Sequence, residues 1–306
     1  MKVTLDLDAL VAGGKLTKDE AVRLKGLAAS DTTALGTNIF LAFGTVAVAL
    51  GAGVLLPSAI TAVVIGGLLM ALGMSLTISK VVRWAVFAQI VTVIGALGVL
   101  GGVMLLSNGS VWINLALAVG LAVASVAALS GLLASLSVLM LSVAMGSTTA
   151  YWSASYFLGV DRPALTIGVL CLLILGLYLL SLRLPHMYER LAIIAMRTAI
   201  LMVNAAFLVG SLFGDGLLGW SSGAFSIVWA LALLAFGLWA VTANRRWVVN
   251  AVAVFGGIHF YTQWFEWLGP EPFAILGGGL LLIGFGLALA RFNRWISERK
   301  RAAAVA

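Results

Sequence analysis

Ten long apolar stretches occupy most of this chain, and only short polar or glycine-containing loops separate them. Each stretch is long enough to cross a bilayer, because a hydrocarbon core of about 30 Å needs about 20 helical residues. Continuous rather than alternating apolar residues favour helices over the strands of a membrane β-barrel. We therefore predict an all-α, polytopic transmembrane helix bundle with spans at about 34–56, 58–78, 84–106, 111–128, 131–149, 164–183, 191–212, 224–242, 247–266 and 273–293.

The composition supports this class. Hydrophobic residues make up 62% of the 306 residues and charged residues 9%, whereas a soluble domain carries about 25% charged residues. Mean hydropathy is +1.14. The chain then divides into a cytoplasmic amphipathic lead-in (1–33), the helical bundle (34–294) and a short basic cytoplasmic tail (295–306).

The basic residues are distributed unevenly between the two sides of the predicted bundle. With the N-terminus inside, sixteen of the eighteen Lys and Arg residues fall on the inner side, Arg162 falls on the outer side, and Arg197 lies within a span. Cytoplasmic loops of membrane proteins collect Lys and Arg. This asymmetry predicts ten spans, both termini in the cytoplasm, and a multi-pass protein of the bacterial inner (cytoplasmic) membrane. The net charge of +7 is explained by these loops, so we predict membrane lipids and no nucleic acid as partners.

One division between spans stays open. In residues 111–149 only Ser130-Gly131 interrupts a nearly continuous apolar run, so two spans or one overlong helix both fit.

The lead-in predicts two short helices. Residues 5–11 form one helical stretch, Gly13-Gly14 breaks it, and Thr17 with Glu20 forms a capping box that opens the second helix. This module either lies on the membrane surface or serves, through residues 1–33, as a docking or self-association element.

Two resemblances to known groups add expectations. Residues 14–21 carry the pattern Gly-x-Leu-Thr-x-Asp-Glu-Ala, and with residues 9–28 and the closing helices at 246–294 they resemble bacterial membrane proteins of the DUF2157 type. That resemblance implies a helical membrane fold and no particular activity. The layout of about ten short spans with both ends inside is similar to drug/metabolite-type transporters, which implies transport.

Arg197 and Asn204 are polar side chains within the seventh span, seven residues apart on one helix face. Such groups are costly in hydrocarbon and mark candidate functional sites. Together they could bind an anionic or carbonyl group of a substrate. Alternatively, Arg197 extends to the inner headgroups and Asn204 bonds a neighbouring helix.

The ninth span holds a second polar set. His259 and Gln263 share one helix face, and Tyr261 lies on another. His259 could shuttle protons or could be a neutral packing residue. We take Arg197, Asn204, His259, Tyr261 and Gln263 as candidate substrate-binding residues.

No motif predicts catalysis, a cofactor or a metal site. The acidic residues fall in loops or at helix ends, the two histidines lie in different parts of the bundle, and Cys171 has no partner at ligand spacing. The numerous glycines indicate close helix packing or, at Gly277–Gly279, an interrupted helix. The leading hypothesis is a small-solute or lipid-type transporter with a polar path between helices, and the alternative is a non-catalytic membrane scaffold or regulatory partner.

Overall fold

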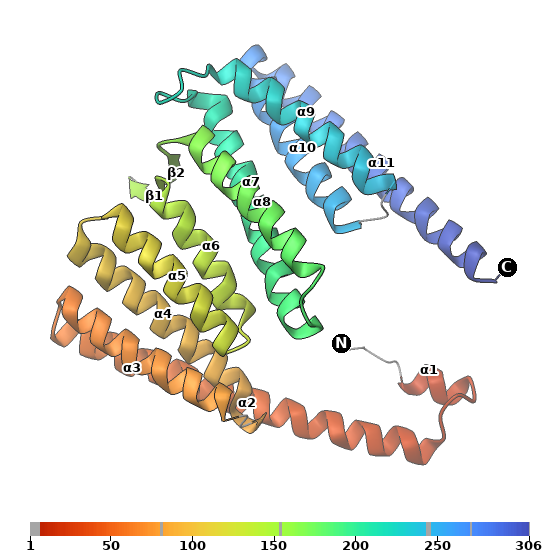
Figure 1. The fold of residues 1–306 in the computed structure, drawn as a ribbon. Helices are drawn as coiled ribbons and strands as arrows, with labels where there is room; N and C mark the ends of the chain where they lie inside the picture. Colours follow the sequence, from red (N-terminus) through yellow and green to blue (C-terminus); the bar gives the residue numbers. More distant parts are fainter. Residues whose placement is uncertain (1–6, 80–81, 153–154, 243–245, 270, 306) are drawn as a thin grey trace. The chain divides into compact units, whose positions relative to one another are not determined.

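The structure is a computed structural model that describes residues 7–79, 82–152, 155–242, 246–269 and 271–305 (Figure 1). Nearly all of this part of the chain is helical, as the sequence predicts. In chain order the elements are α1 (Leu7–Ala12), α2 (Lys18–Leu55), α3 (Ala59–Ile78), the short 3-10 helix η1 (Val82–Trp84), α4 (Ala85–Ser107), α5 (Val111–Ala127), α6 (Gly131–Ala144), β1 (Ser147–Trp152), β2 (Ser155–Val160), α7 (Pro163–Ser181), α8 (His186–Phe213), α9 (Ser222–Thr242), α10 (Arg246–Leu268) and α11 (Pro272–Val305).

Each predicted span corresponds to one of the helices α2 to α11. Within the described residues, six helices are long and apolar enough to cross a membrane: α2 through its part Gly36–Leu55, and α3, α4, α7, α8 and α9. α5, α6 and the apolar part of α11, Pro272–Ala288, are shorter. The helical, membrane-like class is thus confirmed, while ten crossings and the location of the termini stay predictions.

The open division at residues 111–149 resolves into two helices. α5 ends in a Schellman-type turn, in which Leu129 takes a left-handed conformation (φ 49°) and the Ser130 backbone N–H donates to the Ser125 carbonyl at 2.9 Å. The Ser130 hydroxyl then accepts from the backbone N–H of Leu133, which starts α6. One overlong helix is therefore excluded.

The two outer predicted domain boundaries fall inside continuous helices. α2 runs for 38 residues through residue 33, and α11 runs for 34 residues through residue 294. The predicted capping box is confirmed: the Thr17 hydroxyl accepts from the Glu20 backbone N–H, and the Glu20 carboxylate accepts from the Thr17 backbone N–H at 2.9 Å. The helical stretch predicted at residues 5–11 is observed from Leu7 onward, and residues 5–6 lie outside the described residues.

A β-hairpin replaces part of one predicted helix and the loop after it. α6 ends at Ala144, and β1 pairs with β2 antiparallel, from Ser147 opposite Val160 to Trp152 opposite Ser155. Gly146, at φ 100°, makes the turn between helix and strand. These residues are rich in Thr, Tyr, Phe and Trp, which favour strands. The purely helical prediction missed this hairpin.

The chain forms two compact units. Unit 1 comprises Met1–Ala144 and Leu180–Ala195, and unit 2 comprises Met145–Leu179 and Met196–Ala306. In unit 1, α3 and α4 approach until their backbones touch. A Cβ added to Gly66 would lie 2.6 Å from the Val99 nitrogen, and one added to Gly102 would lie 2.7 Å from the Ala59 carbonyl oxygen. Small residues at such contacts are typical of membrane helix pairs.

The core of unit 2 contains a group of large aromatic side chains. Phe225 and Trp229 of α9 are essentially inaccessible, with 0% and 1% exposure. Phe207 of α8 stacks on Trp229 with ring centroids 6.2 Å apart and contacts Phe225 edge to face. Gly277–Gly279 are helical within α11, so the predicted interruption is not observed. A Cβ added to Gly278 would lie 3.3 Å from the Trp264 ring, which shows how closely this part of α11 approaches α10.

Candidate functional site

Asn204 connects α8 to α9 through its side-chain amide. Its Oδ1 accepts a hydrogen bond from the indole Nε1 of Trp229 at 2.9 Å, and its Nδ2 donates to the Ile200 carbonyl at 2.8 Å. The indole N–H can only donate, so the amide oxygen must face it. Asn204 is buried, at 9% exposure, and both ends of its amide are occupied. Of the two predicted roles, the structure shows the bond to a neighbouring helix.

Trp229 of α9 contacts polar side chains on two other helices. Its ring contacts the His259 ring of α10 edge to face, with centroids 4.8 Å apart and planes at 70°. It therefore links Asn204 on α8 to His259 on α10. Trp229 is not among the site residues predicted from the sequence, although its position carries a signal. Membrane tryptophans gather at the interfaces, whereas Trp229 lies well inside the 21-residue α9.

His259 and Gln263 follow each other by one turn of α10 and share a face. His259 Nδ1 and Gln263 Nε2 are buried and have no hydrogen-bond partner among the described residues. A buried polar group without a hydrogen-bond partner costs about 1–3 kcal/mol. The Gln263 nitrogen is a donor, and the His259 nitrogen donates or accepts according to the tautomer. This pair therefore offers hydrogen-bonding capacity that matches a hydroxyl or a carbonyl oxygen.

We refer to Asn204, Trp229, His259 and Gln263 as the polar cluster. It brings together three of the five predicted site residues. The other two lie elsewhere in unit 2. The Arg197 side chain is exposed, and its Cζ lies 5.0 Å from the centroid of the Trp247 ring, a cation–π contact. Tyr261 is 37% exposed and packs edge to face on Phe265.

Asp215, in the loop before α9, is a further buried polar group and is not among the predicted site residues. Its Oδ2 accepts from the backbone N–H of Ala164 at 2.9 Å, and its Oδ1 accepts from the backbone N–H groups of Leu217 and Leu218. Burial raises the pKa of this carboxyl, but the three backbone hydrogen bonds outweigh burial and hold the pKa below its ordinary value. Asp215 thus fastens its loop to the start of α7, a structural role.

The described residues contain no group of three or more His, Cys, Asp or Glu side chains that could hold a metal ion. Two grooves lie beside α2 in unit 1, and none of the five predicted site residues lines them.

Six apolar helices of spanning length among the described residues give the chain a helical, membrane-like architecture. Comparison with protein-family models, with curated proteins and with solved structures found no match to this chain. The resemblance to the DUF2157 type therefore stays a prediction.

Proposed function

We propose that this chain is a ten-span protein of the bacterial inner membrane, with both termini in the cytoplasm, that transports a small polar solute past the polar cluster. The observation that supports transport is the pair of buried, unpartnered nitrogens of His259 and Gln263. A buried polar group without a hydrogen-bond partner costs free energy, so a solute that hydrogen-bonds to both nitrogens removes that cost.

The solute that fits this cluster is neutral and carries a hydroxyl or a carbonyl oxygen. A hydroxyl accepts from the Gln263 amide nitrogen and either donates to or accepts from His259 Nδ1, and a carbonyl oxygen accepts from both when Nδ1 carries the proton. A carboxylate would instead bring a negative charge that no cationic side chain of the polar cluster balances. Arg197, which would attract an anion, contacts Trp247 instead of the cluster.

A cysteine-accessibility experiment tests whether a polar path reaches the cluster. Cys171 is the single cysteine, so a Cys171→Ala background carries no other thiol. In that background Gln263→Cys should react with a charged, membrane-impermeant thiol reagent. Ile258→Cys, on the same helix at a position 38% exposed, is the matched control and should face lipid and stay unreactive. A Gln263→Cys thiol that resists the reagent from both sides of the membrane contradicts the proposed path.

A second function, a non-catalytic scaffold that binds a partner through residues 1–33, is favoured by the length of α2. Residues 18–35 of this helix precede its apolar part, and at 1.5 Å per residue they extend the helix by about 27 Å. The full chain should then purify with a stoichiometric partner that is lost when residues 1–33 are removed. Purification of the full chain alone, unchanged by that deletion, counts against the scaffold.

A further inference from the structure

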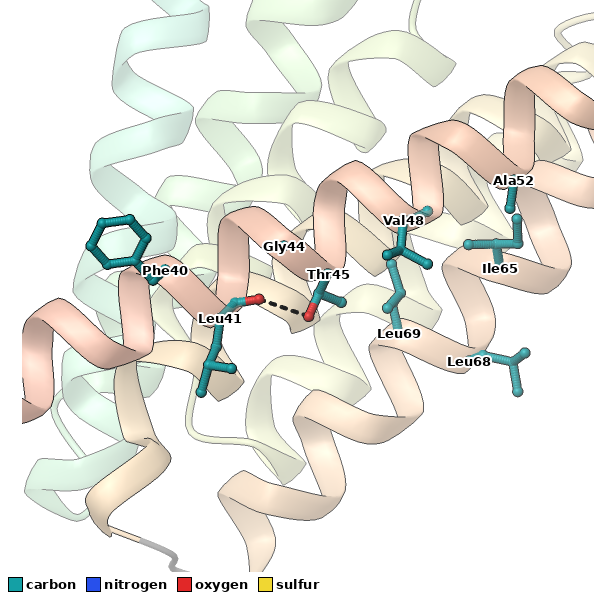
Figure 2. A pocket seen from close by; sticks show the side chains of 10 residues that line it. Phe40, Leu41, Gly44, Thr45, Val48, Ala52, Ile65, Leu68 and Leu69 are labelled. Atoms are coloured by element: carbon teal, nitrogen blue, oxygen red, sulfur yellow. Dashed lines mark hydrogen bonds between the residues drawn. The ribbon is translucent and has the colours of Figure 1, made fainter.

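An apolar groove runs between α2 and α3 in unit 1 (Figure 2). Its volume is about 580 Å³. Its lining is formed by two helices only: Phe40, Leu41, Gly44, Thr45, Val48, Ala49 and Ala52 of α2, and Ile65, Leu68 and Leu69 of α3.

The groove has the length of one lipid leaflet. From Phe40 to Ala52, α2 rises by about 18 Å at 1.5 Å per residue, and half of a hydrocarbon core is about 15 Å. In Figure 2 Val48 and Leu69 point toward one another, whereas Leu41 points into the space where the two helices diverge. The groove is therefore narrow toward the α2–α3 turn and opens toward the start of the span.

The lining offers nothing to a polar ligand. Its single hydroxyl, on Thr45, donates to the Leu41 carbonyl at 2.8 Å and is satisfied within α2. The occupant must therefore present hydrocarbon along the length of the groove.

The open end of the groove carries positive charge. Asn38, buried at 5% exposure, donates from Nδ2 to the Arg83 carbonyl at 2.9 Å, which fixes η1 beside α2. Arg83 is exposed. No acidic residue occurs between Asp31 and Asp161, so no carboxylate from this long stretch neutralises the Arg83 guanidinium.

We propose that unit 1 binds an anionic phospholipid, with one acyl chain in the α2–α3 groove and the phosphate at Arg83. Basic residues at the membrane surface attract anionic headgroups. An apolar groove whose open end lies near such a residue selects a molecule that has both an anionic headgroup and a hydrocarbon chain. This site is independent of the polar cluster, which lies in unit 2.

The headgroup is tested with delipidated full-length protein titrated with phosphatidylglycerol or phosphatidylcholine and examined by native mass spectrometry. Phosphatidylglycerol should bind more tightly, and Arg83→Gln should lower its affinity by about fivefold, the factor expected for one basic residue at the surface. Arg162→Gln, at an exposed arginine outside the groove, should leave the affinity unchanged. Inorganic phosphate should not compete, because it lacks the acyl chain.

The acyl chain is tested with two glycine substitutions on α2. A Cβ added at Gly44 or at Gly51 meets nothing within 4 Å, so we expect both variants to fold, but only Gly44 lines the groove. Gly44→Leu should remove the bound phosphatidylglycerol, and Gly51→Leu should retain it. The proposal would be overturned by equal affinity for the two lipids, or by an equal loss of phosphatidylglycerol affinity in the two arginine variants. A dimer that Gly44→Leu dissociates would also overturn it, because a second copy of the chain would then fill the groove.

Discussion

At the scale of single residues, the bond from Trp229 to Asn204 is the contact most open to test. Trp229→Phe keeps the aromatic packing but removes the indole N–H that donates to the Asn204 oxygen. Hydrogen bonds between membrane helices contribute about 0.6 kcal/mol on average and at most about 1.7. Because Trp229 is 1% exposed and no water replaces the donor, we expect a loss of about 1 kcal/mol, measured by thermal unfolding in detergent.

The matched control is Trp239→Phe, on the same helix but 47% exposed, which should leave the stability unchanged. The double variant Trp229→Phe with Asn204→Leu should lose less than the sum of the two single changes, because no buried acceptor is left unpaired. Additive losses would show that the hydrogen bond contributes nothing.

Asp215 predicts a dependence of stability on pH. Its pKa in the folded protein lies below the ordinary value of 3.8, so folding favours the ionised form. The stability that Asp215 contributes is present above 3.8 and is lost as the pH falls through the lower, folded-state pKa. The melting temperature of the native chain should therefore exceed that of Asp215→Ala at neutral pH, and the difference should shrink in acid. A difference that stays constant with pH would show that the carboxylate charge plays no part.

At the scale of secondary-structure elements, the α3–α4 pair makes the clearest prediction. Gly66 faces the α4 backbone, whereas its neighbour Gly67 faces open space. Gly66→Leu should force the helices apart and destabilise unit 1 by about 1–3 kcal/mol or more, the usual cost of overpacking. Gly67→Leu, the control, should be tolerated. Thermal unfolding of the two variants distinguishes them, and similar melting temperatures would contradict the close packing.

The elements also show how far the sequence could predict this fold. Long apolar runs bounded by Pro57, Asn108 or Pro163 gave helices close to the observed ones, because hydropathy and helix breakers act locally. The predicted end of α6 was wrong because Gly146 ends the helix and the Ser-Thr-Thr segment at 147–149 belongs to β1. Pairing with residues 155–160, which the local hydropathy of the span does not show, decides the conformation of that segment.

The candidate site was predictable only in part, for a related reason. Spacing on one helix correctly placed His259 and Gln263 on a common face of α10. Spacing cannot show which neighbouring helix a face meets, so the partner of Asn204 proved to be Trp229 and that of Arg197 proved to be Trp247. Both partners are aromatic, a residue type that in membrane helices is expected at the interface.

At the scale of the whole molecule, the number of crossings depends on α5 and α6. They have 17 and 14 residues, or about 26 and 21 Å at 1.5 Å per residue, which is less than a core of about 30 Å. Their connecting turn carries no Lys or Arg, so the charge asymmetry does not determine its side. The side on which the termini lie does not depend on α5 and α6. If the two helices form a hairpin that enters and leaves the membrane by the same face, the number of crossings falls by two and stays even.

Ten crossings place Leu129, in that turn, at the cytoplasmic surface and Ser110, before α5, at the outer surface. In a Cys171→Ala background, Leu129→Cys should react with an impermeant maleimide in inside-out vesicles only, and Ser110→Cys in right-side-out cells only. Leu129 is 44% exposed, and the Ser110 side chain caps no helix, so neither change removes a hydrogen bond. If Leu129→Cys were protected from both sides while Ser110→Cys reacted outside, α5 and α6 would form a re-entrant hairpin and the crossings would number eight. The inward-facing termini would survive that result, because they depend on the basic residues in the other loops.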